Sequence, residues 1–505
     1  MKHPIQKILP ALKKYVFQNH AQWKYWVVLA IIFKTLIFAL HLSQAEPAKE
    51  VGFIGYDSGD SQSYLDPVEN LINHGVYSPD YRMPGYAVAY VPLRLVFEKA
   101  MACNAMLIIQ LLMASLAVYC LALTARHAFQ SDTMFYLVFY VYLISSYANL
   151  FDAFLLTESL CTSVTIFSIY FFSRFTEKRL SKYLMISGLF LTWAIFLRPV
   201  YAPLLLLFCG ALLVEGLLIR ISIKAALRTV LIFVIPFTIL ESCWITRNYV
   251  AHKRFIPLTQ SFYYPGTEDT YIIELMDFVK SWGGDRTWWN PKAEIRWFGL
   301  TERQQGRSRP LENGNVSLPE YIFTSKFSSD SLVAIKKNIQ TIDADGTPDS
   351  VCVALTSLVK KKLVNYTTSL KEEKPFIYYV KAPLLLVKKF FIHSGTYNLF
   401  NKPFQELSPI ALLTKVFYSI LYLVTILGGM VGIVWAVRRR WTSPITLLLT
   451  GATLYSVLFF PVVLRQIEFR YFVPAYPLMT VMACYFFLQV ARFVRSLYFK
   501  PIEGR

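Results

Sequence analysis

Residues 56–86, YDSGDSQSYLDPVENLINHGVYSPDYRMPGY, form a polar stretch directly after the first long apolar run of the chain. The stretch carries carboxylates at Asp57, Asp60, Asp66 and Glu69 and ends in a basic Arg-Met-Pro-Gly turn. Charged groups at the edge of an apolar region are costly unless they are paired or used. Carboxylates followed by an Arg at this position therefore predict a functional site, around which the remaining sequence can be placed.

The composition predicts a helical membrane protein. The chain has 505 residues, of which 55% are apolar and 16% aromatic. The apolar runs are continuous rather than alternating, which favours membrane helices over a barrel. The formal net charge is +19, but most Lys and Arg lie in short clusters beside apolar runs. This is the positive-inside pattern and not a nucleic-acid surface. The seven Cys show no disulfide or metal-ligand spacing.

The apolar runs predict about ten membrane spans, near 25–43, 104–125, 133–151, 153–173, 183–199, 200–219, 229–246, 410–436, 443–463 and 472–491. Residues 85–98 are also apolar, but about 14 residues are too few to cross a core about 30 Å thick. We therefore expect them to lie in the interface. With the basic clusters inside, both chain ends are inside, and the 56–86 stretch and the polar segment at 247–385 are outside.

We therefore expect an all-α polytopic membrane protein with about ten or more transmembrane helices, juxtamembrane helices and a mixed extracytoplasmic domain. Residues 1–246 would form an N-terminal transmembrane module whose first outer loop, 44–103, is catalytic. Residues 247–400 would form the extracytoplasmic domain, and residues 401–505 the C-terminal transmembrane helices. The expected location is integral and multi-pass, in a bacterial inner membrane, with the active site on the extracytoplasmic side.

This topology gathers charged residues on the outer face. They are Asp57, Asp60, Glu158, Arg198, Arg247 and Arg470. A carboxylate there can act as a general base toward a hydroxyl group. An Arg at the lipid boundary can hold a phosphate and stabilise it as a leaving group. Together they suit group transfer from a lipid phosphate.

Five of these residues also have a structural interpretation. Asp57 and Asp60 can cap a helix that begins near Ser61. Glu158 and Arg198 can form a structural ion pair. Arg247 can be an anchor at the end of a span. These alternatives stay open at the level of sequence.

Six segments, taken in order, resemble the GT-C fold glycosyltransferases, in the group of the protein O-mannosyltransferases and the lipid A aminoarabinose transferases. The segments are GDSQSYLDPVENLINHGVYS (59–78), RMPGYAVAYVPL (82–93), FLLTESLCTSVTIF (154–167), GLFLTWAIFLRPVYAPLLL (188–206), WITRNYVAHKRFIPLTQS (244–261) and FRYFVPAYPLMTVMA (469–483). The resemblance spans the membrane portion and is weak over about 250–380. The aminoarabinose branch has Lys followed by two Pro where this chain has Arg-Met-Pro-Gly, so the donor sugar stays open.

The resemblance implies roles for individual residues. The acidic base of the family falls on Asp60, four residues before Tyr64, with Asp57 as the fallback. The second acidic position falls on Glu158. The basic residue before the Pro is Arg82, and Arg247 and Arg470 are further candidates for the donor phosphate. Tyr64, Tyr86 and Arg198 would line the substrate cavity.

The function this implies is transfer of a sugar from a polyprenyl- or dolichyl-phosphate donor to an acceptor hydroxyl on the extracytoplasmic side. The acceptor would be a protein, a lipid or a glycan, and the displacement would invert the anomeric centre with Asp60 as the base. A divalent metal held by Asp57 and Asp60 is left open, and we favour a metal-independent reaction. The alternative is a transporter or flippase for a lipid-linked or anionic substrate, which would also place Arg and acidic groups in a membrane cavity.

Overall fold

The computed structural model describes residues 22–44, 54–55, 60–259, 270–304, 307–311, 316–396, 404–440 and 443–498. The chain divides into two compact units. The first unit comprises Met1–Gln260, Ser394–Tyr455 and Phe472–Arg505, and the second comprises Ser261–His393 and Ser456–Tyr471.

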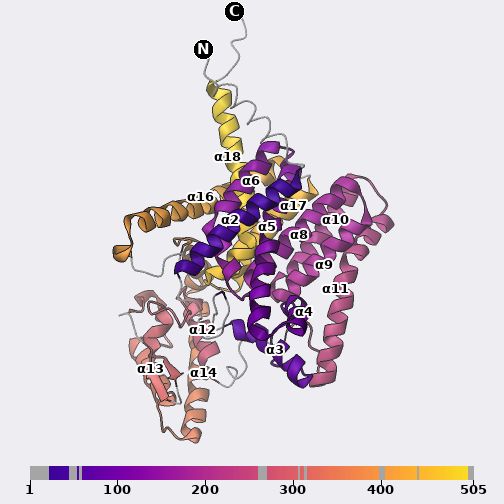
Figure 1. The fold of residues 1–505 in the computed structure, drawn as a ribbon. Coiled ribbons are helices and arrows are strands. Elements are labelled where there is room, and N and C mark those ends of the chain that lie inside the picture. Colours follow the sequence, from indigo (N-terminus) through magenta and orange to yellow (C-terminus); the bar gives the residue numbers. More distant parts are fainter. Residues whose placement is uncertain are drawn as a thin grey trace, which may run out of the picture. The chain divides into compact units, whose positions relative to one another are not determined.

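The first unit is built from helices (Figure 1). Its N-terminal elements are α2 (Trp23–Gln44), α3 (Ser61–His74), α4 (Ala87–Val96), α5 (Lys99–Phe129), α6 (Asp132–Ile144), α7 (Ser146–Asn149), η1 (Leu150–Ala153), α8 (Thr157–Lys178), α9 (Ser181–Leu197), η2 (Pro199–Tyr201), α10 (Pro203–Leu218) and α11 (Ile223–His252). Its later elements are η6 (Phe404–Glu406), α16 (Pro409–Arg440), α17 (Pro444–Leu458) and α18 (Tyr476–Tyr498).

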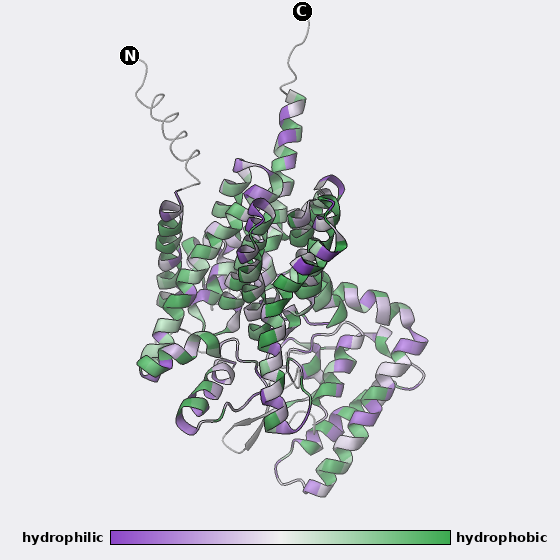
Figure 2. Ribbon diagram, turned by 90° about the vertical axis from the view of Figure 1, so that its right-hand side faces the viewer, coloured by the Kyte–Doolittle hydropathy of each residue, from purple (hydrophilic) through white to green (hydrophobic). Residues whose placement is uncertain are grey.

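Seven helices in the described residues are long and apolar enough to cross a membrane. They are Trp23–Leu42, Lys99–Phe129, Pro199–Leu218, Ile223–His252, Pro409–Arg439, Pro444–Val463 and Phe469–Leu497. Figure 2 shows that apolar residues dominate the long helices of the first unit. The chain is therefore an all-α polytopic membrane protein, as the composition predicts.

The remaining three predicted spans, 133–151, 153–173 and 183–199, do not form single helices that are both long and apolar enough to cross a membrane. The pair Asp132–Ile144 and Ser146–Ala153 is bent by 61° and gives an eighth crossing if it is one span. α9 has 17 residues, and α8 is rich in Ser and Thr. These two helices pack on each other through Ser168 and Ser187, whose hydroxyls each donate to the other's backbone carbonyl at 2.9 and 2.8 Å. Small hydroxylated residues allow such close helix packing, at the expense of hydropathy.

The 85–98 run contains α4, a helix of only ten residues. This agrees with the prediction that the run does not cross the membrane. Nearby, α3 begins at Ser61, where the sequence predicts a helix start, and ends at Gly75 with φ 71°. This left-handed conformation favours glycine and stops the helix there.

The second unit has its own apolar core, around Phe278, Phe298, Phe327 and Tyr366. Its elements are α12 (Ile272–Ser281), η3 (Glu294–Phe298), β1 (Thr301–Gln304), β2 (Arg307–Pro310), η4 (Glu320–Ile322), α13 (Ser329–Ile342), α14 (Asp349–Glu373), η5 (Ile377–Lys381), α15 (Ala382–Phe391) and η7 (Phe459–Val463). β1 and β2 pair antiparallel, with Thr301 opposite Pro310. The element η8 (Phe469–Ala475) leads along the chain into α18.

Candidate functional site

Asp60 and Arg82 lie at the centre of the candidate site. Asp60 occupies the position before the first residue of α3, but its side chain makes no capping hydrogen bond. Its Oδ1 instead lies 3.3 Å from Nη2 of Arg82, and its side chain is only 8% exposed. The guanidinium also donates from Nε to the Ser63 hydroxyl at 3.2 Å and lies over the Tyr64 ring at 4.7 Å. The carboxylate is thus directed at a cation rather than used as a cap.

The turn that carries Arg82 is locked to the end of α9 by Gly85. The Gly85 N–H donates to the Phe196 carbonyl at 3.2 Å, and its own carbonyl accepts from the Trp193 indole at 2.8 Å. A Cβ on Gly85 would lie 2.3 Å from the backbone nitrogen of Leu197. Only glycine permits this approach. The backbone contact brings the Arg-Met-Pro-Gly turn beside Arg198, the residue that follows α9.

We therefore expect Gly85→Ala to destabilise the protein by about 1–3 kcal/mol, the usual cost of overpacking. The added methyl group would force the turn away from α9. Gly210→Ala is the matched control, because a Cβ on Gly210 meets nothing within 4 Å. Thermal unfolding of the purified variants measures the difference. Equal unfolding temperatures would show that the turn is not held as described.

Glu158 and Arg198 form a second, more deeply buried ion pair. The Arg198 Nη2 lies 2.5 Å from Oε1 of Glu158, and its Nε donates to the Thr157 hydroxyl at 3.0 Å. The Glu158 side chain is 0% exposed and that of Arg198 is 8% exposed. Both acidic and basic groups come from helix ends, because Glu158 lies in the first turn of α8 and Arg198 follows α9.

Two tyrosines pack beside the Asp60–Arg82 pair. The Tyr64 and Tyr86 rings are 5.6 Å apart. Burial raises the pKa of Tyr86, and Cys103, Tyr64 and Glu158 raise it further. The Tyr86 hydroxyl donates to Oε1 of Gln110 at 3.3 Å. The structure therefore joins Asp60, Arg82, Tyr64 and Tyr86 through direct contacts, and the backbone contact of Gly85 brings this group to the end of α9, which Arg198 follows.

Arg247 fastens the first loop to α11. Its guanidinium pairs with Asp80 and donates to the Tyr77 carbonyl at 2.7 Å. Nε2 of His252 lies 2.5 Å from the same carboxylate. Burial raises the pKa of Asp80, but hydrogen bonds from Arg247 and His252 outweigh it and leave that pKa below its usual value. In this structure Arg247 thus holds the first loop, and its role as a ligand of the donor phosphate stays a prediction.

Two further predicted residues are not among the contacts described above. Arg470 belongs to the second unit, where its Nε lies 2.5 Å from Oε1 of Glu468. Asp57 lies outside the described residues. Among the residues that the structure describes, no three His, Cys, Asp or Glu side chains are grouped closely enough to hold a metal.

Sequence reasoning missed a buried charge beside the site. Lys34 of α2 donates to Oδ1 of Asn149 and to Oδ2 of Asp152, both at 2.7 Å. The Ser159 hydroxyl donates to the other Asp152 oxygen at 2.6 Å. This network ties α2 to the start of α8, next to Glu158. The sequence does contain a signal for this network, because a single Lys inside an apolar run, here Lys34, requires a polar partner.

Comparison with known proteins agrees with the resemblance over part of the chain. Residues 95–240 match the family model described as dolichyl-phosphate-mannose-protein mannosyltransferase. The predicted resemblance to the GT-C glycosyltransferase group is confirmed in this region, which contains Glu158 and Arg198. No curated protein sequence matches the chain.

Solved structures of the Archaeoglobus fulgidus oligosaccharyltransferase are similar to most of the chain. The match to the apo form has a TM-score of 0.45 and 12% sequence identity, and it covers 94% of this chain and 52% of the oligosaccharyltransferase chain. The form tethered to an acceptor peptide containing the NVT sequon has a TM-score of 0.44, 12% identity, and coverage of 94% and 51%. The complex with an inhibitory peptide and a dolichol-phosphate has a TM-score of 0.43, 13% identity, and coverage of 95% and 52%. The chain thus spans about half the length of these proteins.

Proposed function

We propose that the protein is a membrane glycosyltransferase that moves a sugar from a polyprenyl-phosphate donor to an acceptor hydroxyl on the extracytoplasmic side. The observation that carries this proposal is the Asp60–Arg82 contact, made in a loop that Gly85 fixes to the end of α9. The description of the matched family, which names a dolichyl-phosphate-linked mannose and a protein acceptor, supports the donor class.

The chemistry is a single displacement at the anomeric carbon. Asp60 accepts the proton of the acceptor hydroxyl, and the oxygen forms a bond to the anomeric carbon as the bond to the phosphate oxygen breaks. The bonding electrons leave on the lipid phosphate, whose charge Arg82 stabilises. Attack on the face opposite the leaving group inverts the anomeric centre.

The 3.3 Å contact between Asp60 and Arg82 makes these two roles interdependent. In an inverting displacement the base and the leaving phosphate lie on opposite sides of the sugar, so the ion pair must open when the donor enters. The donor phosphate replaces Asp60 as the partner of Arg82, and the released carboxylate is then able to accept a proton. Donor binding therefore activates the base.

Arg82→Gln is expected to lower the rate of transfer by roughly 10²- to 10³-fold, as loss of a stabiliser of developing charge does. The assay supplies the purified full chain with labelled polyprenyl-phosphate sugars and with peptide, lipid and glycan acceptors. Arg254→Gln is the control, because Arg254 is an exposed cation beyond α11. Undiminished transfer by Arg82→Gln would contradict the assigned role, and no transfer by the wild type to any acceptor would contradict the function.

A further inference from the structure

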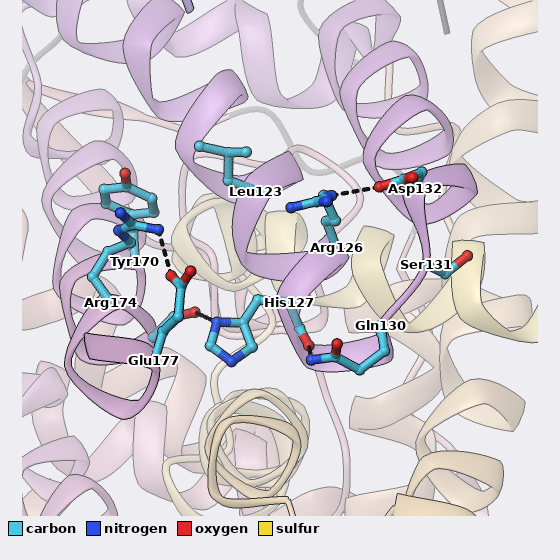
Figure 3. A pocket seen from close by; sticks show the side chains of 10 residues that line it. Leu123, Arg126, His127, Gln130, Ser131, Asp132, Tyr170, Arg174 and Glu177 are labelled. Carbon is cyan, nitrogen blue, oxygen red and sulfur yellow. Dashed lines mark hydrogen bonds and ion pairs between the residues drawn. The ribbon is translucent and has the colours of Figure 1, made fainter. Parts of the chain in front are cut away.

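A cavity of about 330 Å³ lies at the ends of α5 and α8 and the start of α6. These are the helix ends that carry basic clusters and are predicted to face the cytoplasm, whereas the candidate catalytic site lies at the opposite ends of α8 and α9. The cavity lining is mainly polar, and charged groups reach it from all three helices (Figure 3). It is separate from the site described above.

Two ion pairs flank this cavity. Nε of Arg126 lies 2.5 Å from Oδ1 of Asp132 on one side, and Arg174 pairs with Glu177 on the other. Figure 3 shows His127 between the two pairs. Its Nδ1 lies 3.0 Å from the Ser173 hydroxyl. Within the described residues, Arg126 uses only Nε and Arg174 only Nη1 in these contacts. The remaining guanidinium donors are available to a ligand.

The pairs are open to rearrangement. The side chains of Asp132 and Glu177 are 58% and 46% exposed, and those of Arg126 and Arg174 are 40% and 27% exposed. Ion pairs with this exposure contribute little to stability, because water screens them. A ligand can therefore compete for the guanidinium groups of Arg126 and Arg174.

The charges select the kind of ligand. Two guanidinium groups and two carboxylates balance, so a ligand with one sign of charge would meet repulsion from half of the site. A ligand with both a phosphate and an ammonium group can bind the guanidinium groups and the carboxylates at once. Arg binds phosphate with two parallel hydrogen bonds, and carboxylates accept hydrogen bonds from ammonium. A primary ammonium donates three hydrogen bonds and a quaternary ammonium donates none, which favours ethanolamine over choline.

We propose that this cavity binds a phosphoethanolamine group, with its phosphate on the guanidinium of one ion pair and its ammonium on the carboxylate of the other, across the cavity. Its place at the ends of membrane helices fits a lipid headgroup, because Arg side chains in pockets between such helices bind lipid phosphate groups. Free phosphoethanolamine has the same phosphate and ammonium groups. The experiment therefore distinguishes the lipid headgroup from the soluble compound.

The test measures retained lipid by native mass spectrometry of the full chain, purified in detergent and incubated with phosphatidylethanolamine, phosphatidylcholine or phosphatidylglycerol. We expect one retained phosphatidylethanolamine and at least about tenfold less of the other two, which corresponds to the loss of one good charged contact. In a separate measurement, free phosphoethanolamine is added at the same concentration and the unfolding temperature of the protein is recorded. A rise in this temperature shows that the soluble compound binds. A shift without lipid retention would assign the site to the soluble compound.

Two double variants decide the assignment. Arg126→Gln with Arg174→Gln removes the phosphate contacts, and Asp132→Asn with Glu177→Gln removes the ammonium contacts. Both should lower retention of phosphatidylethanolamine by about tenfold or more. Lys182→Gln, an exposed cation in the same region that does not line the cavity, should leave it unchanged.

The variant Asp132→Asn with Glu177→Gln best distinguishes a zwitterionic ligand from an anionic one. If the cavity held an anionic lipid, removing Asp132 and Glu177 would strengthen retention of phosphatidylglycerol and would overturn the proposal. Equal retention of the three lipids, or retention unaffected by either double variant, would also overturn it. Thermal unfolding confirms that each variant is folded before its lipid is measured.

Discussion

Asp60→Asn is expected to lower the rate of sugar transfer by roughly 10²- to 10⁴-fold, the range that a positioned general base contributes. Asn has nearly the same size as Asp but cannot accept the hydroxyl proton. The fold should survive the change, because Asp60 does not cap α3 through its side chain and its contact with Arg82 lies at the start of that helix. The loss should therefore appear in kcat and not in the yield of folded protein.

Asp66→Asn is the matched control for this experiment. Asp66 lies on α3 as well, one and a half turns further on, and the change removes the same charge. Initial rates with labelled donor, together with the amount of donor lipid bound by each variant, give the comparison. Asp60→Asn should still bind donor, since Arg82 is retained and no longer has a carboxylate competing for it. Transfer at the wild-type rate would exclude Asp60 as the base.

The local structure around Asp60 follows from sequence patterns. The polar residues before Ser61 and the glycine at position 75 mark both ends of α3, and the structure places the helix between them. The short apolar run at 85–98 is too short to span, and it forms α4. These features depend on residues close in the chain, for which capping, length and turn rules are informative.

Contacts between segments that are distant in the sequence could not be predicted from sequence patterns. Nothing in the sequence shows that Gly85 meets Phe196 and Leu197, or that Tyr86 reaches Gln110, because such contacts depend on how each helix is rotated about its axis. The Lys34–Asp152 contact joins residues 118 positions apart. A lone Lys in a span predicts a partner without identifying it. Likewise, the sequence predicts a phosphate-binding role for Arg247 but does not identify Asp80 and Tyr77 as its contacts.

The second large effect concerns the Glu158–Arg198 pair, which has both a structural and a functional interpretation. Replacing either residue alone, as in Glu158→Gln or Arg198→Met, leaves a buried group without its charged partner. We expect each single change to cost about 3–5 kcal/mol, the usual result of breaking a buried ion pair. The side-chain exposures of 0% and 8% place the pair in this class rather than among weak surface pairs. Thermal unfolding of the purified variants measures the cost.

The double variant, Glu158→Gln with Arg198→Met, separates the two interpretations. Replacing both charges in a buried pair is often nearly neutral for stability, so the unfolding temperature should return toward that of the wild type. If the pair only holds α8 to the end of α9, sugar transfer should return with it. If Arg198 lines the substrate cavity, as the resemblance implies, the double variant will be stable and will still transfer sugar at least about tenfold more slowly, because a charged contact with the substrate is absent. A stable double variant with full activity would reduce the pair to a structural role and leave Asp60 and Arg82 as the reacting groups.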